Sequence, residues 1–130
     1  MKKPTNQLSG RTLRWAVAKC LTVTGQAAGF DIRNGVPYVH SRTAYLPADF
    51  DINWGSTGPI KERAGIVSGA TVPGEFFARL SQSFDAPQFI AATELVAICR
   101  CYVQSVLGDV VDLPDELLVP AEEALVGEFR

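Results

Sequence analysis

The side chains best suited to nucleophilic chemistry in this 130-residue chain are three cysteines and one histidine. A thiol becomes an activated nucleophile when an imidazole lies beside its sulfur. Cys20 and Cys99 fall on the apolar faces of predicted helices, so we expect both to be buried, and we expect Cys101 to be exposed. His40 lies at the end of a predicted strand. The pattern therefore favours structural thiols and a surface histidine.

Polar side chains alternate at Asp49, Asp51 and Asn53, as they do at the start of a calcium-binding loop. That loop requires Gly at its sixth position and Glu at its twelfth, and the chain has Trp54 and Ile60 there. A polar turn is the favoured interpretation, and a metal site with Asp49 and Asp51 as ligands is the alternative. The chain has neither four closely spaced Cys or His ligands for zinc nor the Gly-Lys-Ser/Thr of a phosphate-binding loop. We therefore expect no cofactor.

Charge is unevenly distributed along the chain, whose net charge is −2. Residues 1–19 contain five Lys or Arg and no acid, and residues 109–130 contain seven acids and one Arg. Arg11, Arg14 and Lys19, with Trp15, form a small basic and aromatic patch. It could bind a nucleic-acid backbone, the acidic end of this chain or of a second copy, or an acidic partner. The net charge makes nucleic acid the least favoured of these, and pairing of the basic and acidic ends predicts a possible homodimer.

Apolar periodicity and turn residues predict the elements that must position these side chains. A helix should begin after Ser9, with one buried stripe formed by Leu13, Ala16, Val17 and Cys20. Strands are predicted at 30–33 and 36–39, joined by an Asn-Gly turn, and at 66–68 and 75–80. A short helix should span 59–64. This order predicts an α+β fold: a small antiparallel sheet of about four strands, covered on one face by two main helices, plus the short middle helix.

The last long helix should begin after Asp85 and end at Gly108. At 100° per residue its apolar half includes Phe89 and Ala92. The opposite half includes Ala97 and Cys101, which we expect to be exposed. The predicted buried positions are Phe89, Ala92, Leu95, Val96, Ile98, Cys99, Tyr102, Val103, Val106 and Leu107.

The composition, 47% hydrophobic and 20% charged, is typical of one globular domain. We expect residues 1–7 to be a loose polar lead, 8–118 a single α+β domain, and 119–130 an acidic tail or short helix. No apolar run approaches the roughly 20 residues of a membrane-spanning helix. The odd number of cysteines, without a secretory signal, predicts a cytoplasmic location.

Three segments together carry a family resemblance. The first is 8–20, with Leu-Ser-Gly followed by Leu-Arg-Trp-Ala-Val-Ala-Lys-Cys. The second extends from Tyr45 and Pro47 through Asn53-Trp54 to the run Gly-Pro-Ile-Lys-Glu-Arg-Ala-Gly-Ile at 58–66. The third is Arg-Cys-Tyr-Val at 100–103, with Leu-Gly-Asp at 107–109, a proline at 114 and Glu-Leu at 116–117. The chain resembles the NinX-like proteins of phages and prophages, a domain-of-unknown-function family, over most of residues 8–118.

The resemblance implies a phage or prophage origin and a bacterial cytoplasm, and it supplies no reaction. The chain departs from the family pattern at Asn53, where Asp is usual, and at Lys61, where an apolar residue is usual. The best candidates for a family surface are four residues that could equally fix their loop to the core: Trp54, Gly58, Pro59 and Glu62.

Two functions from different classes are consistent with these observations. The first is a phage or prophage accessory protein that binds a host or phage protein, which would account for the lack of a catalytic set. The alternative is a small nucleic-acid-associated factor or enzyme that uses the loop from Asp49 to Arg63, with Asp49, Asp51 and Glu62 meeting in a pocket. A flat apolar surface around Trp54 would favour the first, and a polar cleft would favour the second.

Overall fold

The computed structural model describes residues 1–33, 36–40, 48–49, 51–81 and 87–114, with only the backbone at 33, 48 and 49. Within these residues the α-helices are α1 (Gly10–Val23), α2 (Trp54–Ala64) and α3 (Glu94–Leu107). A short 3-10 helix, η1, spans Thr5–Gln7. None of these helices is both long and apolar enough to cross a membrane.

The strands of the described residues are short, and every pair is antiparallel, so the α+β class is confirmed. They form three sheets, with orders β1-β8, β2-β3-β4 and β5-β6-β7, and not one sheet of about four strands. The bounds are β1 Lys2–Pro4, β2 Gly29–Arg33, β3 Val36–His40, β4 Ala48–Asp49, β5 Ile66–Val72, β6 Glu75–Leu80, β7 Phe89–Ala91 and β8 Val110–Asp112.

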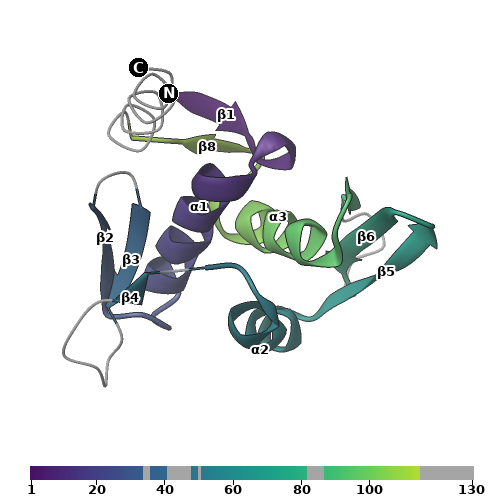
Figure 1. Cartoon of the computed structure of the whole chain (residues 1–130), viewed down its shortest axis with the longest axis horizontal. Helices are drawn as coiled ribbons and strands as arrows, with labels where there is room; N and C mark the ends of the chain where they lie inside the picture. Colours follow the sequence, from purple (N-terminus) through teal and green to yellow (C-terminus); the bar gives the residue numbers. More distant parts are fainter. Residues whose placement is uncertain (34–35, 41–47, 50, 82–86, 115–130) are drawn as a thin grey trace, which may run out of the picture.

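The two predicted hairpins are separate because each has its own helix to cover it. Strands β2 and β3 pack on α1, and strands β5, β6 and β7 pack on α3. Figure 1 shows α1 and α3 side by side in the middle, with one sheet outside each helix and α2 beside α3. A sheet buries one apolar face, and here each three-stranded sheet buries that face against a different helix.

The buried stripe of α1 is as predicted, with Leu13, Ala16, Val17 and Cys20 all 0% exposed. Ser9 precedes the helix, and its backbone N–H donates to Thr12 Oγ1 at 3.2 Å. This part of the fold depends on residues close together in the sequence, which explains why the periodicity was sufficient to predict it.

The last helix differs from its prediction in length and in burial. It begins at Glu94 after the cap residue Thr93, whose side chain accepts a hydrogen bond from Val96 N. Phe89–Ala91 is strand β7 instead, and the predicted cap Asp85 lies outside the described residues. The predictions of an exposed Ala97 and Cys101 are wrong, since their exposed fractions are 0% and 1%. Helices α1 and α2 and the sheet β5-β6-β7 surround α3, so its two sides are both covered.

The first residues of the chain belong to the fold and are not a loose lead. Strand β1 pairs with β8, with Lys2 opposite Asp112. Thr5 is 1% exposed, its N–H donates to Asp109 O at 2.8 Å, and its Oγ1 donates to Gly108 O at 2.6 Å. Local sequence gave no signal for this strand because its partner lies at the other end of the domain. Residues 119–130 lie outside the described residues.

Candidate interaction surface

Helix α2 presents an exposed tryptophan at its first residue. Asn53 Oδ1 accepts from Ser56 N at 3.0 Å, and Asn53 N donates to Ser56 Oγ at 3.1 Å, so the two residues cap the helix reciprocally. The helix therefore begins five residues before the predicted start at Pro59, which lies inside it. Trp54 is 52% exposed.

Gly65 ends α2 in the left-handed conformation, with φ of 69°. It directs the chain at once into strand β5. The α2 helix is consequently fixed at both ends, which holds Trp54 against the start of α3.

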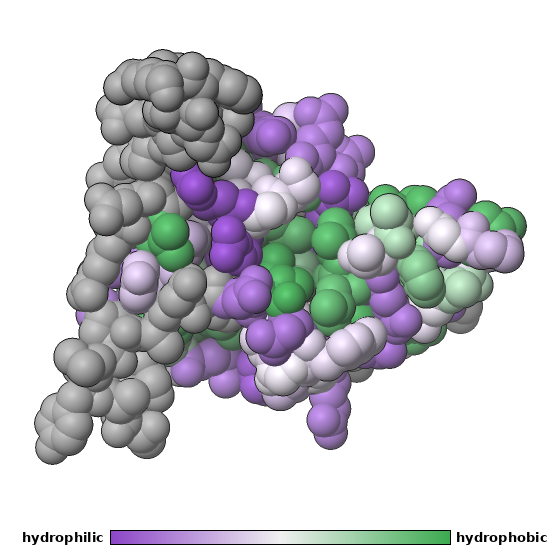
Figure 2. Space-filling view, viewed as in Figure 1, coloured by the Kyte–Doolittle hydropathy of each residue, from purple (hydrophilic) through white to green (hydrophobic). Residues whose placement is uncertain are grey.

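Two shallow grooves lie at this place and share Thr93 and Leu95. One, of about 350 Å³, extends from Trp54 across Phe76 and Ala92. The other, of about 370 Å³, continues past Ile52 to the first turns of α1. We call the area that the two grooves form together the Trp54 surface, and define it by Ile52, Trp54, Phe76, Ala92, Thr93 and Leu95. In the space-filling view an apolar area lies over α3, bordered by hydrophilic side chains (Figure 2).

Paired charges border the Trp54 surface. Arg14 Nη1 lies 3.9 Å from Asp51 Oδ1 on one side. Lys61 Nζ lies 3.7 Å from Glu94 Oε2 on the other, and Ser68 Oγ donates to the same oxygen at 2.6 Å. These charged groups are thus paired within the chain. They form a hydrophilic edge around the apolar middle of the surface.

The structure brings only some of the predicted site residues together. Trp54 lines one groove, and Arg14 and Asp51 line the other. Glu62 and Pro59 are exposed on α2 but line neither groove, and Gly58 is half-buried. Sequence reasoning missed Phe76, Thr93 and Leu95, because sheet pairing and helix packing bring them beside Trp54 from distant segments.

The predicted basic and aromatic patch is not one exposed surface. Trp15 is only 5% exposed and packs edge-to-face on Phe30, with ring centroids 5.8 Å apart. Lys19 Nζ lies 5.2 Å from the centre of the Trp15 ring. Arg11 is half-buried, and its Nη1 is enclosed without a hydrogen-bond partner in the described residues. Trp15 is therefore a core residue, which corrects its place among the binding residues.

The thiols do not form a nucleophilic pair with the histidine. Cys20, Cys99 and Cys101 are all buried, and burial raises the pKa of each thiol, to about 12 for Cys20 and about 11 for the other two. His40 Nε2 instead lies 3.5 Å from Asp31 Oδ2. These pKa values leave the thiols protonated at neutral pH. Because the thiolate is the reactive form, the three thiols are poor nucleophiles there.

No group of three His, Cys, Asp or Glu in the described residues is arranged to hold a metal ion. The side chain of Asp49, one of the two alternative ligands, lies outside these residues. The carboxylate of the other, Asp51, accepts from Ile52 N at 2.8 Å and faces Arg14. The chemistry of the described residues around Trp54 is thus apolar contact with a charged border.

Comparison with known proteins gave no match, either among models of protein families or among curated sequences.

Proposed function

We propose that this chain is an accessory protein of a phage or prophage that acts by binding a host or phage protein through the Trp54 surface. The phage origin and the bacterial cytoplasm rest on the resemblance of residues 8–118 to the NinX-like family. The binding role rests on one structural observation. Trp54 is 52% exposed and lines one of two adjoining shallow, mainly apolar grooves.

Exposed tryptophan is the kind of residue that carries binding energy in protein interfaces. Interfaces are enriched in aromatic residues at their centres and in polar residues at their rims. The Trp54 surface has this arrangement, with its apolar centre and its paired charges Arg14–Asp51 and Lys61–Glu94. A partner can cover the centre without removing unpaired charges from water, which keeps the desolvation cost of binding low.

The alternative function, a nucleic-acid factor or enzyme at the 49–63 loop, has weaker support. If α1 met a nucleic acid, the Trp15 ring could not stack on its bases, because this ring is buried. A catalytic pocket in the loop would require Glu62 to face the same cavity as Asp51. Glu62 does not line the groove that Asp51 lines.

The test is capture of partners from a phage-infected or lysogenic bacterial lysate, with immobilised parent protein and two variants. Trp54→Ala removes the exposed ring, and Val23→Ala removes an exposed apolar side chain that is 62% accessible at the end of α1. A captured protein is then purified and titrated against all three. We expect Trp54→Ala to weaken binding at least tenfold, about 1.4 kcal/mol, and Val23→Ala to leave it unchanged.

Equal binding by parent and Trp54→Ala would refute this surface as the binding site. Both variants should melt within a few degrees of the parent, since each changes an exposed side chain.

A further inference from the structure

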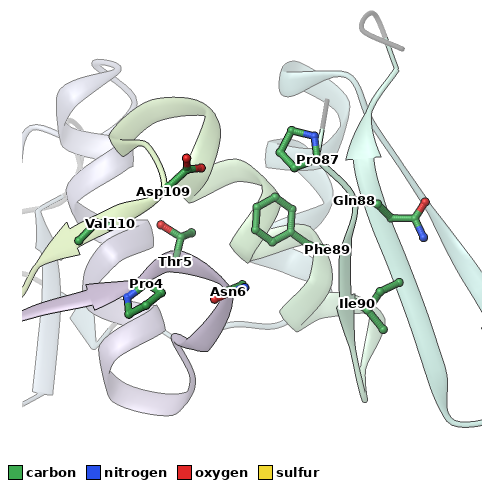
Figure 3. Close-up of a pocket in the computed structure, with 9 residues that line it drawn as sticks. All are labelled: Pro4, Thr5, Asn6, Pro87, Gln88, Phe89, Ile90, Asp109 and Val110. Carbon is green, nitrogen blue, oxygen red and sulfur yellow. The ribbon is translucent and has the colours of Figure 1, made fainter. Parts of the chain in front are cut away.

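A further groove, apart from the two beside Trp54, lies next to strand β7. Its volume is about 580 Å³. Residues 4–6 line one side, residues 87–90 line the other, and residues 109–110 close it (Figure 3). It shares no lining residue with the Trp54 surface. We call it the β7 groove.

One edge of β7 is free in the described residues, because β7 is the last strand in the order β5-β6-β7. In an antiparallel pair, alternate residues direct their backbone hydrogen-bonding groups to a given neighbour. Ser81 N donates to Gly65 O at 2.8 Å, so the odd-numbered residues of β6 face β5. The even-numbered residues face β7, where they oppose Phe89 and Ala91. Ile90 therefore directs its N–H and C=O to the free edge.

This edge forms a wall of the β7 groove. Four consecutive residues, 87–90, line the groove although successive side chains of a strand point to opposite faces. Figure 3 shows the Phe89 ring directed toward Thr5 and Asp109, and the Ile90 side chain directed away from them. The groove is consequently bounded by backbone as well as by side chains.

A strand added at this edge would have a place for its side chains. Every second residue of the strand would lie on the Phe89 face and enter the groove. There it would meet Phe89, a residue that is 7% exposed, and Val110, which is 50% exposed. A groove of this volume is within the usual range of binding pockets, so it can accept an aliphatic or aromatic side chain.

The charge of the groove indicates what kind of strand it would accept. Asp109 is the one ionisable side chain among its described lining residues, and its Oδ1 accepts from Gln104 Nε2 at 3.2 Å. No Lys or Arg of the described residues forms a salt bridge with Asp109, so this carboxylate favours a Lys or Arg on the incoming segment. Strand β5, whose outer edge is also free in the described residues, has neither Lys nor Arg, so charge does not favour β5 of a second copy as the added strand.

We infer that the β7 groove binds an extended segment of a partner protein as an added β-strand. The segment has an apolar residue that enters the groove over Phe89 and a Lys or Arg beside it that faces Asp109. Backbone hydrogen bonds to Ile90 supply affinity, and the groove supplies selectivity, as in other cases of strand addition. This site is independent of the Trp54 surface.

The experiment pans a displayed library of random ten-residue peptides against the whole protein and titrates the enriched peptides with variants. Ile90→Pro removes the N–H at the free edge, and a proline is tolerated where that N–H faces solvent. Ile90→Val is its matched control, since it keeps the N–H. Asp109→Lys reverses the charge of the groove, and Trp54→Ala tests the other surface.

We expect enriched peptides with alternating apolar residues and a Lys or Arg, and at least tenfold weaker binding by Ile90→Pro and Asp109→Lys. Ile90→Val and Trp54→Ala should bind within twofold of the parent. Hydrogen exchange should show the Ile90 amide unprotected in the free protein and protected with peptide bound.

Four results would overturn the inference. The first is the absence of any enriched peptide, and the second is binding that Ile90→Pro leaves intact. The third is an Ile90→Pro variant that unfolds, because the Ile90 N–H would then be bonded within the sheet. Peptides lost with Trp54→Ala alone would be assigned to the Trp54 surface, so they too would count against the β7 groove.

Discussion

At the scale of single residues, burial decides what the three cysteines can do. Cys20 lies on the inner stripe of α1, and Cys99 and Cys101 lie on α3. Cys99 Sγ is 3.7 Å from Thr57 Oγ1, which gives it a polar neighbour inside the core. All three act as small apolar side chains, and their chemistry appears only when the chain unfolds.

Because the thiols are buried, the stability of the fold should decrease with pH in the alkaline range. The pKa of Cys20 is raised from its ordinary value of 9.0 to about 12, and those of Cys99 and Cys101 to about 11, mainly because burial disfavours the thiolate. Above pH 9 the unfolded chain loses thiol protons and the folded chain keeps them. Stability is therefore complete below pH 9 and falls as pH rises toward 11–12, by up to about 1.4 kcal/mol per pH unit for each thiol.

Urea denaturation at pH 8, 9, 10 and 11 measures this slope. Cys20→Ala should reduce the slope even though it also lowers stability at pH 8. A thiol reagent added to the native protein should modify all three cysteines slowly, and Cys101 no faster than Cys99. An unchanged slope in Cys20→Ala, or rapid labelling of Cys101, would contradict the burial described above.

At the scale of the elements, α3 shows what local periodicity could and could not predict. Its apolar face and its end at Gly108 followed from spacing. Its start did not, because Phe89–Ala91 pairs with β6 and leaves the helix pattern. The burial of Ala97 did not follow from spacing either. The projection assumes that a helix buries one side, whereas α3 is covered by α1, α2 and a sheet and buries residues on two sides.

Substitutions at two alanines distinguish the burial seen in the structure from the burial that the sequence predicts. Ala97 is 0% exposed, whereas Ala92 is exposed just before the helix. Ala97→Leu should lower the free energy of unfolding by about 1–3 kcal/mol, because the close-packed interior has no room for the larger side chain. Ala92→Leu should change it by less than about 0.5 kcal/mol. Chemical denaturation of both variants checks this, and the reverse order would restore the sequence-based helix projection.

The sequence could predict the candidate site only at Trp54, because that residue could be proposed without knowledge of its neighbours in space. An exposed aromatic at Trp54 could be proposed from the loop that contains it. Its neighbours Phe76 and Leu95 could not, since they reach it through β6 and α3 and no local pattern specifies that approach. For the same reason the burial of Trp15 under Phe30 required knowledge of where β2 crosses α1.

At the scale of the whole molecule, the β1–β8 pair connects the start of the chain to the segment that follows α3. Met1 O accepts from Leu113 N at 2.7 Å, and Thr5 bonds to residues 108 and 109. The pair thus holds the exit of α3 in place and forms one wall of the β7 groove.

Deletion of residues 1–7 should therefore destabilise the protein substantially. It removes β1 and η1, including the buried Thr5 and its two hydrogen bonds, each worth about 1 kcal/mol. We expect a loss of roughly 2–4 kcal/mol in urea denaturation, and almost no change for Lys2→Ala, which alters an exposed side chain of β1. A deletion as stable as the parent would mean that these residues are the loose lead expected from their composition.

Strand β5 has a consequence for solubility. In the part of the chain that the structure describes it is the outermost strand of its sheet, and its seven residues, Ile66–Val72, include no charge and no proline. Natural edge strands usually carry such residues because they prevent other chains from adding to the open backbone. The irregularity between Ala70 and Val72 interrupts only the outer end. At high concentration, or when heating loosens the fold, this edge is where aggregation should begin, whatever the net charge of the rest of the surface.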